Sequence, residues 1–145
     1  MDETCAGTLC GAVREVLETM FFTDPVGEWG HALADPITVQ VSFAGPPDGC
    51  LELLLSKSAA GLLAANFLGM EEECTEEQTC EVACEAANMI CGLVLSRTGA
   101  GALFRLGSPR LTNGEEPGGR LSAACCFELE AGEAGARLYW DRSDA

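Results

Sequence analysis

The sequence predicts an α+β fold, in which one antiparallel β-sheet has helices packed against one of its faces. Three observations predict it. Apolar residues recur with helical spacing over residues 8–22 and 76–97. Runs in which apolar and polar residues alternate, or which are rich in β-branched residues, occur in consecutive pairs joined by turn residues. This arrangement is typical of antiparallel hairpins. The length of 145 residues suits a single core, so residues 1–145 are expected to form one domain.

Each element has a local signal in the chain. The first helix should stop at Thr23-Asp24-Pro25, because the residue before a proline is pushed out of the helical region. Ser58 is the expected N-cap of a short helix that Gly69 closes. Thr75 and Gln78 have the spacing of a capping box. In chain order we expect a helix 8–22, a loop 24–36, strands 37–45 and 50–56 around a turn, a helix 58–69, a long helix 76–97, and strands 102–107, 120–130 and 136–141.

The composition narrows the class of partner. The formal net charge is −15, which repels phosphate backbones and anionic membrane surfaces, so we expect neither a nucleic-acid nor a membrane partner. No apolar run approaches the roughly 20 residues of a membrane span. The N-terminal MDETCAGTLC has no basic segment followed by an apolar run, as a signal peptide would. The sequence therefore predicts a cytoplasmic protein.

The nine cysteines are the main alternative source of chemistry. No CxxC pair occurs, and a zinc site would need mostly cysteine ligands, because His31 is the chain's one histidine. We expect no metal site and interpret the cysteines as small apolar packing residues. Metal or redox chemistry by Cys80, Cys84 and Cys91, which share a helix face, remains an alternative. His31, in a loop, fits a surface residue better than a catalytic base.

The long helix 76–97 carries its polar residues in one narrow stripe. Successive residues on a helix are about 100° apart, and at that spacing the stripe contains Gln78, Glu81, Glu85, Asn88, Gly92 and Ser96. Apolar residues fill the arc beside it, so most of the helix is expected to be buried. The stripe is either a plain solvent face or a docking surface. Asn88 and Gly92 favour docking, because both are poor helix formers and glycine lets another chain approach closely.

The residue types on the stripe limit what it can do chemically. The amide of Asn88 cannot act as a base near neutral pH, but it donates and accepts hydrogen bonds together. That suits a group holding a water for attack on an already activated phosphoryl centre. Glu85, one turn away, can bind a cation. No phosphate-binding loop or Ser-His-Asp set competes with this pair in the sequence.

The stretch EAANMICG, with Glu85-x-x-Asn88, is followed by Pro109 in LGSPRL, and REVLETMFF lies near the N-terminus. These motifs and the order of the elements resemble the CheC, CheX and FliY phosphatases of bacterial chemotaxis, and the CheX branch most. CheC-type chains often carry Asp or Ser where Glu81 stands here. They also repeat the Glu-Asn helix, whereas helix 8–22 has no such motif. The resemblance therefore implies one site per chain.

The resemblance implies a phosphatase that hydrolyses the aspartyl phosphate of a CheY-like receiver domain of a response regulator. Asn88 would orient the attacking water, and Glu85 would pair with the receiver's lysine. Gln78, Glu81, Gly92 and Ser96 would contact the receiver. The receiver would hold the Mg²⁺, so the chain needs no cofactor of its own.

The resemblance also implies a homodimer paired through the sheet, with the strand from Leu121 to Glu130 as its edge. The alternative is a non-catalytic module that binds a receiver or a flagellar switch component.

Overall fold

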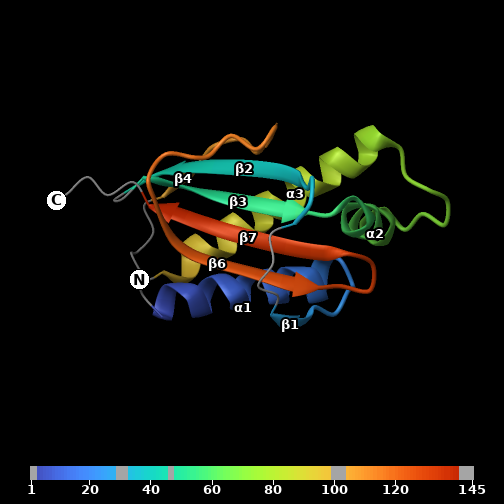
Figure 1. Ribbon diagram of the computed structural model, residues 1–145, viewed down its shortest axis with the longest axis horizontal. Coiled ribbons are helices and arrows are strands. Elements are labelled where there is room, and N and C mark those ends of the chain that lie inside the picture. Colours follow the sequence, from blue (N-terminus) through green and yellow to red (C-terminus); the bar gives the residue numbers. More distant parts are fainter. Residues whose placement is uncertain (1–2, 29–32, 46–47, 99–103, 141–145) are drawn as a thin grey trace.

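Antiparallel pairing of strands builds the central layer of the molecule (Figure 1). The computed structural model describes residues 3–28, 33–45, 48–98 and 104–140. Within them the sheet has the order β1-β6-β7-β3-β2-β4, and β5 also pairs with β2. The strands are β1 Val26–Glu28, β2 Ile37–Ala44, β3 Gly49–Leu55, β4 Arg105–Leu106, β5 Arg110–Thr112, β6 Arg120–Glu128 and β7 Glu133–Trp140. The hairpins β2–β3 and β6–β7 are therefore joined in the middle of the sheet by β3 and β7.

Three helices accompany the sheet over the residues that the structure describes. They are α1 Glu3–Met20, α2 Lys57–Leu68 and α3 Glu76–Arg97. Helices α1 and α3 cover one face, α1 over β6 and β7 and α3 over β2 and β3 (Figure 1). Helix α2 lies beyond the end of the sheet and packs mainly against α3. The expected α+β architecture, with helices gathered on one face, is confirmed.

Alternation along the strands divides the sheet into two faces with different chemistry. Leu51, Leu53 and Leu55 of β3 point toward the helices and are fully buried. On β7, Leu138 pairs with Leu51 and faces the same side. Phe127 of β6 also lies in this core. The core is therefore a layer of large apolar side chains between the sheet and helices α1 and α3.

Several boundaries differ from the sequence expectation. Helix α1 starts at Glu3 rather than residue 8 and stops at Met20, and the expected loop 24–36 contains β1. Strand β5 was not expected, β6 ends at Glu128 rather than 130, and the strand expected over 102–107 is β4 alone within the described residues. These short strands depend on pairing with distant segments, which local patterns do not reveal. Residues 99–103, expected to follow the long helix, and Asp141 lie outside the described residues.

The N-cap of α2 is Ser56, not Ser58 as the sequence suggested. The Ser56 hydroxyl accepts hydrogen bonds from the backbone N–H groups of Ala59 (3.2 Å) and Glu133 (3.0 Å). The second bond comes from the start of β7. Gly132 lies against this hydroxyl with φ of 80°, and a Cβ there would stand 2.1 Å from it. Ser56 therefore joins the helix to the β6–β7 turn, a tertiary contact that propensity alone cannot predict.

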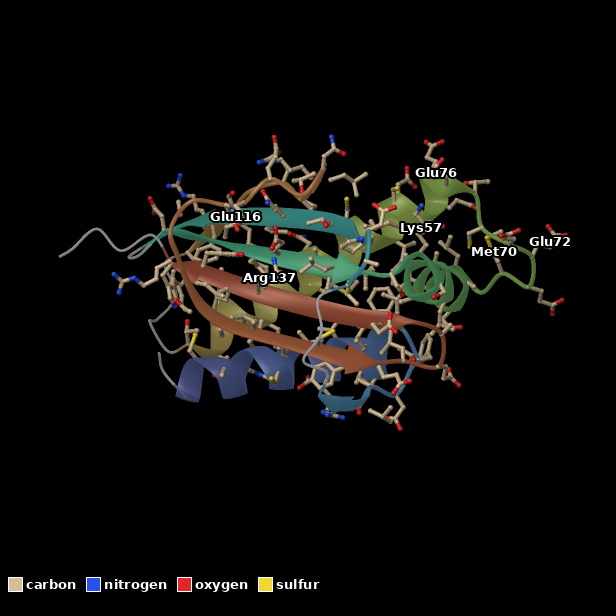
Figure 2. The ribbon with its side chains drawn as sticks, in the orientation of Figure 1. Lys57, Met70, Glu72, Glu76, Glu116 and Arg137 are labelled. Atoms are coloured by element: carbon tan, nitrogen blue, oxygen red, sulfur yellow. The ribbon has the colours of Figure 1, made fainter. Side chains whose placement is uncertain are left out.

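The face of the sheet away from the helices carries a row of polar side chains. The carboxylate of Glu52, 4% exposed, accepts from Arg137 Nη1 (3.2 Å) and from Gln40 Nε2 (3.2 Å). Arg110 Nη2 donates to Gln40 Oε1 (3.3 Å), and Gln40 Nε2 also donates to the carbonyl of Glu115 (2.6 Å). Arg137 projects from this face in Figure 2. The row links four neighbouring strands and anchors the loop 113–119 over them.

Arg137→Met is expected to lower the free energy of unfolding by about 2 kcal/mol. The substitution keeps the apolar stem but leaves the buried Glu52 carboxylate without its cation, and an unpaired buried charge is costly. The figure is below the roughly 3–5 kcal/mol of a fully buried pair because the Arg137 side chain is 38% exposed. Urea denaturation measures the change. Arg120→Met, at an exposed arginine of β6, is the control, and equal losses for the two variants would contradict the role of Arg137.

Candidate functional site

Helix α3 is held by neighbours on most of its circumference. It packs between α1 and α2 and over β2 and β3. Its buried residues include Ala83, Ala86, Ala87, Ile90 and Cys91, and the small size of most of them lets the neighbouring elements come close. Met89 and Leu93 are half-buried beside this core. The packing leaves one exposed line along the helix, which is the polar stripe that the sequence predicts.

The start of α3 is set by the capping box expected from the sequence. The Thr75 hydroxyl accepts from the backbone N–H of Gln78 (3.0 Å), and the Gln78 side-chain oxygen accepts from the backbone N–H of Thr75 (2.8 Å). Glu76 and Glu77 lie in the first turn, where carboxylates offset the positive end of the helix. The Gln78 side-chain oxygen is thus engaged in the cap, which gives this residue a structural role besides the expected contact role.

Glu85 and Asn88 lie side by side on the middle of α3. Glu85 is exposed and Asn88 is half-buried. In the part of the chain that the structure describes, neither side chain makes a hydrogen bond or an ion pair. Residues three apart on a helix are neighbours on its surface. A carboxylate and an amide therefore lie together on a rigid helix with their bonding capacity available to another molecule.

The remaining stripe residues flank this pair. Glu81 is exposed one turn before Glu85. Gly92 has open space above it, since a Cβ built there meets no atom within 4 Å. Ser96 is exposed, and its hydroxyl donates to the carbonyl of Leu93 on the same helix (2.9 Å). The described chain thus gives no internal reason for a glycine at position 92. The space suits the close approach of another molecule.

Burial disfavours ionisation of the cysteines next to the stripe. Burial raises the pKa of the Cys84 thiol, and Cys80, Glu81 and Glu85 add to the rise. Burial raises the pKa of Cys91 to about 12. A raised pKa disfavours the thiolate, the form that binds metals and attacks electrophiles. Within the described residues, no three His, Cys, Asp or Glu side chains are placed to hold a metal ion. Cys91 lies in the hydrophobic core and Cys84 packs against it.

A concave surface that was not expected lies on the face of the sheet opposite the helices. It is a cleft of about 780 Å³, lined among others by Gln40, Cys50, Arg105, Arg110 and Glu115. The sequence signal for this face is Glu52, a lone acid inside the apolar strand CLELLL. Its partners come from distant strands, so local patterns do not identify them. His31 lies outside the described residues.

One helix in the described chain, α3, is long and apolar enough by length and composition to cross a membrane. Its apolar residues, Val82, Ile90 and Val94 among them, are buried in the core of the domain. Core helices of soluble proteins commonly have this composition.

Comparison with known proteins identifies the family. Residues 37–128 match the model of the family "Chemotaxis phosphatase CheX". The matched segment is more than half of the chain and includes α3 with Glu85 and Asn88. The chain belongs to the CheX family. No curated protein matches the chain by sequence.

Solved structures share the CheX fold at low sequence identity. The chemotaxis protein CheX of Vibrio vulnificus has a TM-score of 0.79 and 16% identity, over 94% of this chain and 96% of that one. CheX of Desulfovibrio desulfuricans has a TM-score of 0.74 and 19% identity, over 95% and 99%. A CheX from Borrelia burgdorferi, solved in a CheX-CheY-BeF3-Mg complex, has a TM-score of 0.70 and 18% identity, over 94% and 97%. These matches cover nearly the whole chain, as the sequence resemblance did.

The capping box of α3 gives a stability prediction for this CheX-family chain. Gln78→Ala should lower the free energy of unfolding by about 0.5–1 kcal/mol, because it removes the bond to the Thr75 backbone N–H. Gln78→Glu should stay within about 0.5 kcal/mol of the wild type, since glutamate also completes a capping box. Urea denaturation of the three proteins measures both changes. A loss for Glu as large as for Ala would show that the side chain does not act through the cap.

Proposed function

We propose that this protein is a phosphatase that hydrolyses the aspartyl phosphate of a CheY-like receiver domain, with the site on the exposed stripe of α3. The observation that carries the proposal is the pair of exposed Glu85 and half-buried Asn88, which makes no hydrogen bond or ion pair within the described residues and lies on the exposed line of a largely buried helix. Membership of a chemotaxis phosphatase family and the likeness to a CheX in complex with CheY support the same reaction and partner. The net charge and the receiver partner fit a cytoplasmic protein.

In this proposal Asn88 orients the hydrolytic water. Its amide accepts one hydrogen bond from the water and donates another to the water or to the phosphoryl group. The water oxygen forms a new bond to phosphorus, and the bond from phosphorus to the receiver's aspartate oxygen breaks. The carboxylate is regenerated, and both protons of the water leave with inorganic phosphate as H2PO4⁻. Phosphoryl transfer depends mainly on alignment and charge neutralisation, so a rigidly held amide is a sufficient contribution from this chain.

Glu85 pairs with the lysine of the receiver's active site. The carboxylate is exposed and stands one turn from another acid, Glu81, so it presents negative charge to an incoming cation. This pairing places the receiver so that its phosphoryl group meets Asn88. The receiver supplies Mg²⁺ and its own acids, so no cofactor of this chain is required.

The other stripe residues shape the contact. The open space above Gly92 accommodates the receiver's main chain, and Glu81 and Ser96 extend the polar contact along the helix. Gln78 stands at the end of the stripe, where its amide group remains available while its oxygen serves the cap. In this contact, a row of side chains on α3 inserts into the active site of the receiver.

Asn88→Ala should abolish the acceleration of receiver dephosphorylation, with a loss of at least 100-fold, because water positioning contributes about that much or more. Binding of the phosphorylated receiver should change less than threefold, since the side chain adds little contact area. Glu85→Ala should weaken both binding and turnover. The measurement follows aspartyl-phosphate loss from a CheY-like receiver, phosphorylated by a small-molecule donor in Mg²⁺.

Asn113→Ala is the matched control, because Asn113 is an exposed asparagine in the loop after β5 and not on the stripe of α3. It should retain wild-type activity. Full activity of Asn88→Ala would remove that residue from the mechanism. Receiver binding that is sensitive to Glu85→Ala, without acceleration by the wild type, would establish the alternative of a non-catalytic binding module.

The protein is further proposed to dimerise through the edge of its sheet. Strand β6 pairs with β7 along its length, but β1 covers only its last residues, at Phe127 and Glu128. Over the described residues, the stretch from Arg120 to Cys126 is therefore an open edge, which proteins usually cover. Sedimentation equilibrium at micromolar concentration should give twice the chain mass. A monomer throughout this range would contradict the proposal.

A further inference from the structure

The turn after α1 is fastened to its surroundings at three points. The backbone N–H of Thr23 donates to the carbonyl of Leu17 (3.1 Å). Asn66 Nδ2 of α2 donates to the carbonyl of Phe21 (2.9 Å), and the buried ring of Phe21 stacks on Phe67 at 5.1 Å. Arg14 Nη1 donates to the carbonyl of Pro25 (2.9 Å). The path of residues 21–25 is therefore set by the rest of the fold.

The backbone of Phe22 in this turn has a positive φ angle, which is uncommon for a residue other than glycine. Its φ is 55°, in the left-handed region that favours glycine or asparagine, and its side chain is 68% exposed. Next to it the Thr23 hydroxyl is buried without a hydrogen-bond partner within the described chain. A glycine at position 22 would serve the turn with less strain, and the ring of Phe22 adds little to the core. Strain of this kind is concentrated at functional sites.

Phe22 and Val26 form an exposed apolar patch. With Val26, which is 51% exposed, Phe22 lines a hollow of about 360 Å³ whose other walls are Asp24, Leu129 and Glu130. Two further apolar residues are exposed: Met20, which precedes Phe21 in the sequence, and Leu68, which follows Phe67. A hollow whose walls combine apolar side chains with two carboxylates suits a protein partner that presents an apolar side chain beside basic groups.

The patch lies at the end of α1 and at the β1 edge of the sheet, so α1 separates it from the α3 stripe. Arg97 at the end of α3 is ion-paired with Glu15 of α1. On the α3 wheel, Met89 and Leu93 fall between Glu85 and Arg97, at about 40° and 80° from Glu85. Helix α1 therefore flanks the stripe on the side of these two half-buried apolar residues.

The distance between site and patch is within reach of one partner. Asn88 is nine residues from Arg97, or about 14 Å along α3 at 1.5 Å per residue. Phe22, just past the end of α1 at Met20, is seven residues from Glu15, or about 10 Å at the same rise. A domain of about 100 residues has a radius of gyration near 13 Å, so a single receiver can contact both.

We infer that the Phe22 patch is a second anchor for the receiver domain, which seats an apolar side chain in the hollow while Glu85 and Asn88 enter its active site. The inference rests on the proposed function. The stripe itself is polar and acidic, and interfaces usually need a buried apolar anchor. The acidic rim, Asp24 and Glu130, matches the charge of the stripe, so one partner face with basic groups satisfies both. The same rim repels a second copy of this chain.

The test compares Phe22→Gly and Val26→Ser with wild type, using a CheY-like receiver as the probe. With the receiver held in its active form by beryllofluoride and Mg²⁺, Phe22→Gly should raise Kd about tenfold and Val26→Ser about threefold. In turnover assays KM should rise similarly while kcat stays within twofold, since neither residue contacts the reacting atoms. Phe22→Gly should also raise Tm by roughly 2–4 °C, because glycine relieves the backbone strain.

Leu111→Ser is the matched control for Val26→Ser. Leu111 is 46% exposed on the short edge strand β5, at the opposite edge of the sheet from β1. It should leave Kd and KM unchanged. Unchanged Kd for Phe22→Gly, with wild-type turnover intact, would overturn the second anchor and leave the proposed function standing. Binding of the receiver by wild type without acceleration of dephosphorylation would contradict the phosphatase proposal. The Kd values of the variants would then still test the second anchor. A dimer that dissociates on Phe22→Gly would assign the patch to a second copy instead.

Discussion

The burial of α3 is the constraint on which the rest of the structure depends. The helix is apolar around most of its surface, so it needs the sheet beneath it and a helix on each side. Ala83, Ala86 and Ala87 allow that close packing, because small side chains bring neighbouring backbones near. What remains exposed is one narrow line. The position of Glu85 and Asn88 on that line therefore follows from how the core is packed, and their geometry is as rigid as the core itself.

Much of this arrangement could be predicted from the sequence, because its causes are local. The capping box at Thr75 and Gln78 and the helical period that follows set both ends of α3. The same period places Glu85 and Asn88 on one stripe. Alternating residues and turn glycines identify the two main hairpins. These signals involve neighbours within a few positions, so one sequence is enough to identify them.

The features that sequence reasoning missed all depend on distant parts of the chain. Ser56 rather than Ser58 caps α2 because the β6–β7 turn donates a second hydrogen bond to it. Glu52 is tolerated in the sheet because Arg137, far along the chain, lies on the neighbouring strand. The conformation of Phe22 follows from bonds that α2 makes to the turn. None of these contacts leaves a spacing pattern, so the structure was needed to find them.

Rigid placement of solvated side chains has a thermodynamic consequence for specificity. In the free protein the carboxylate of Glu85 is exposed to water, and any partner must remove that water. Desolvating a carboxylate is unfavourable unless a cation replaces the lost hydrogen bonds. The half-buried amide of Asn88 likewise requires partners for both its donors and its acceptor. A surface lacking a suitably placed cation and a polar group one helical turn away would leave these groups unpaired, so it would bind weakly. Selectivity on this helix thus comes from the cost of wrong partners as much as from the attraction of the right one.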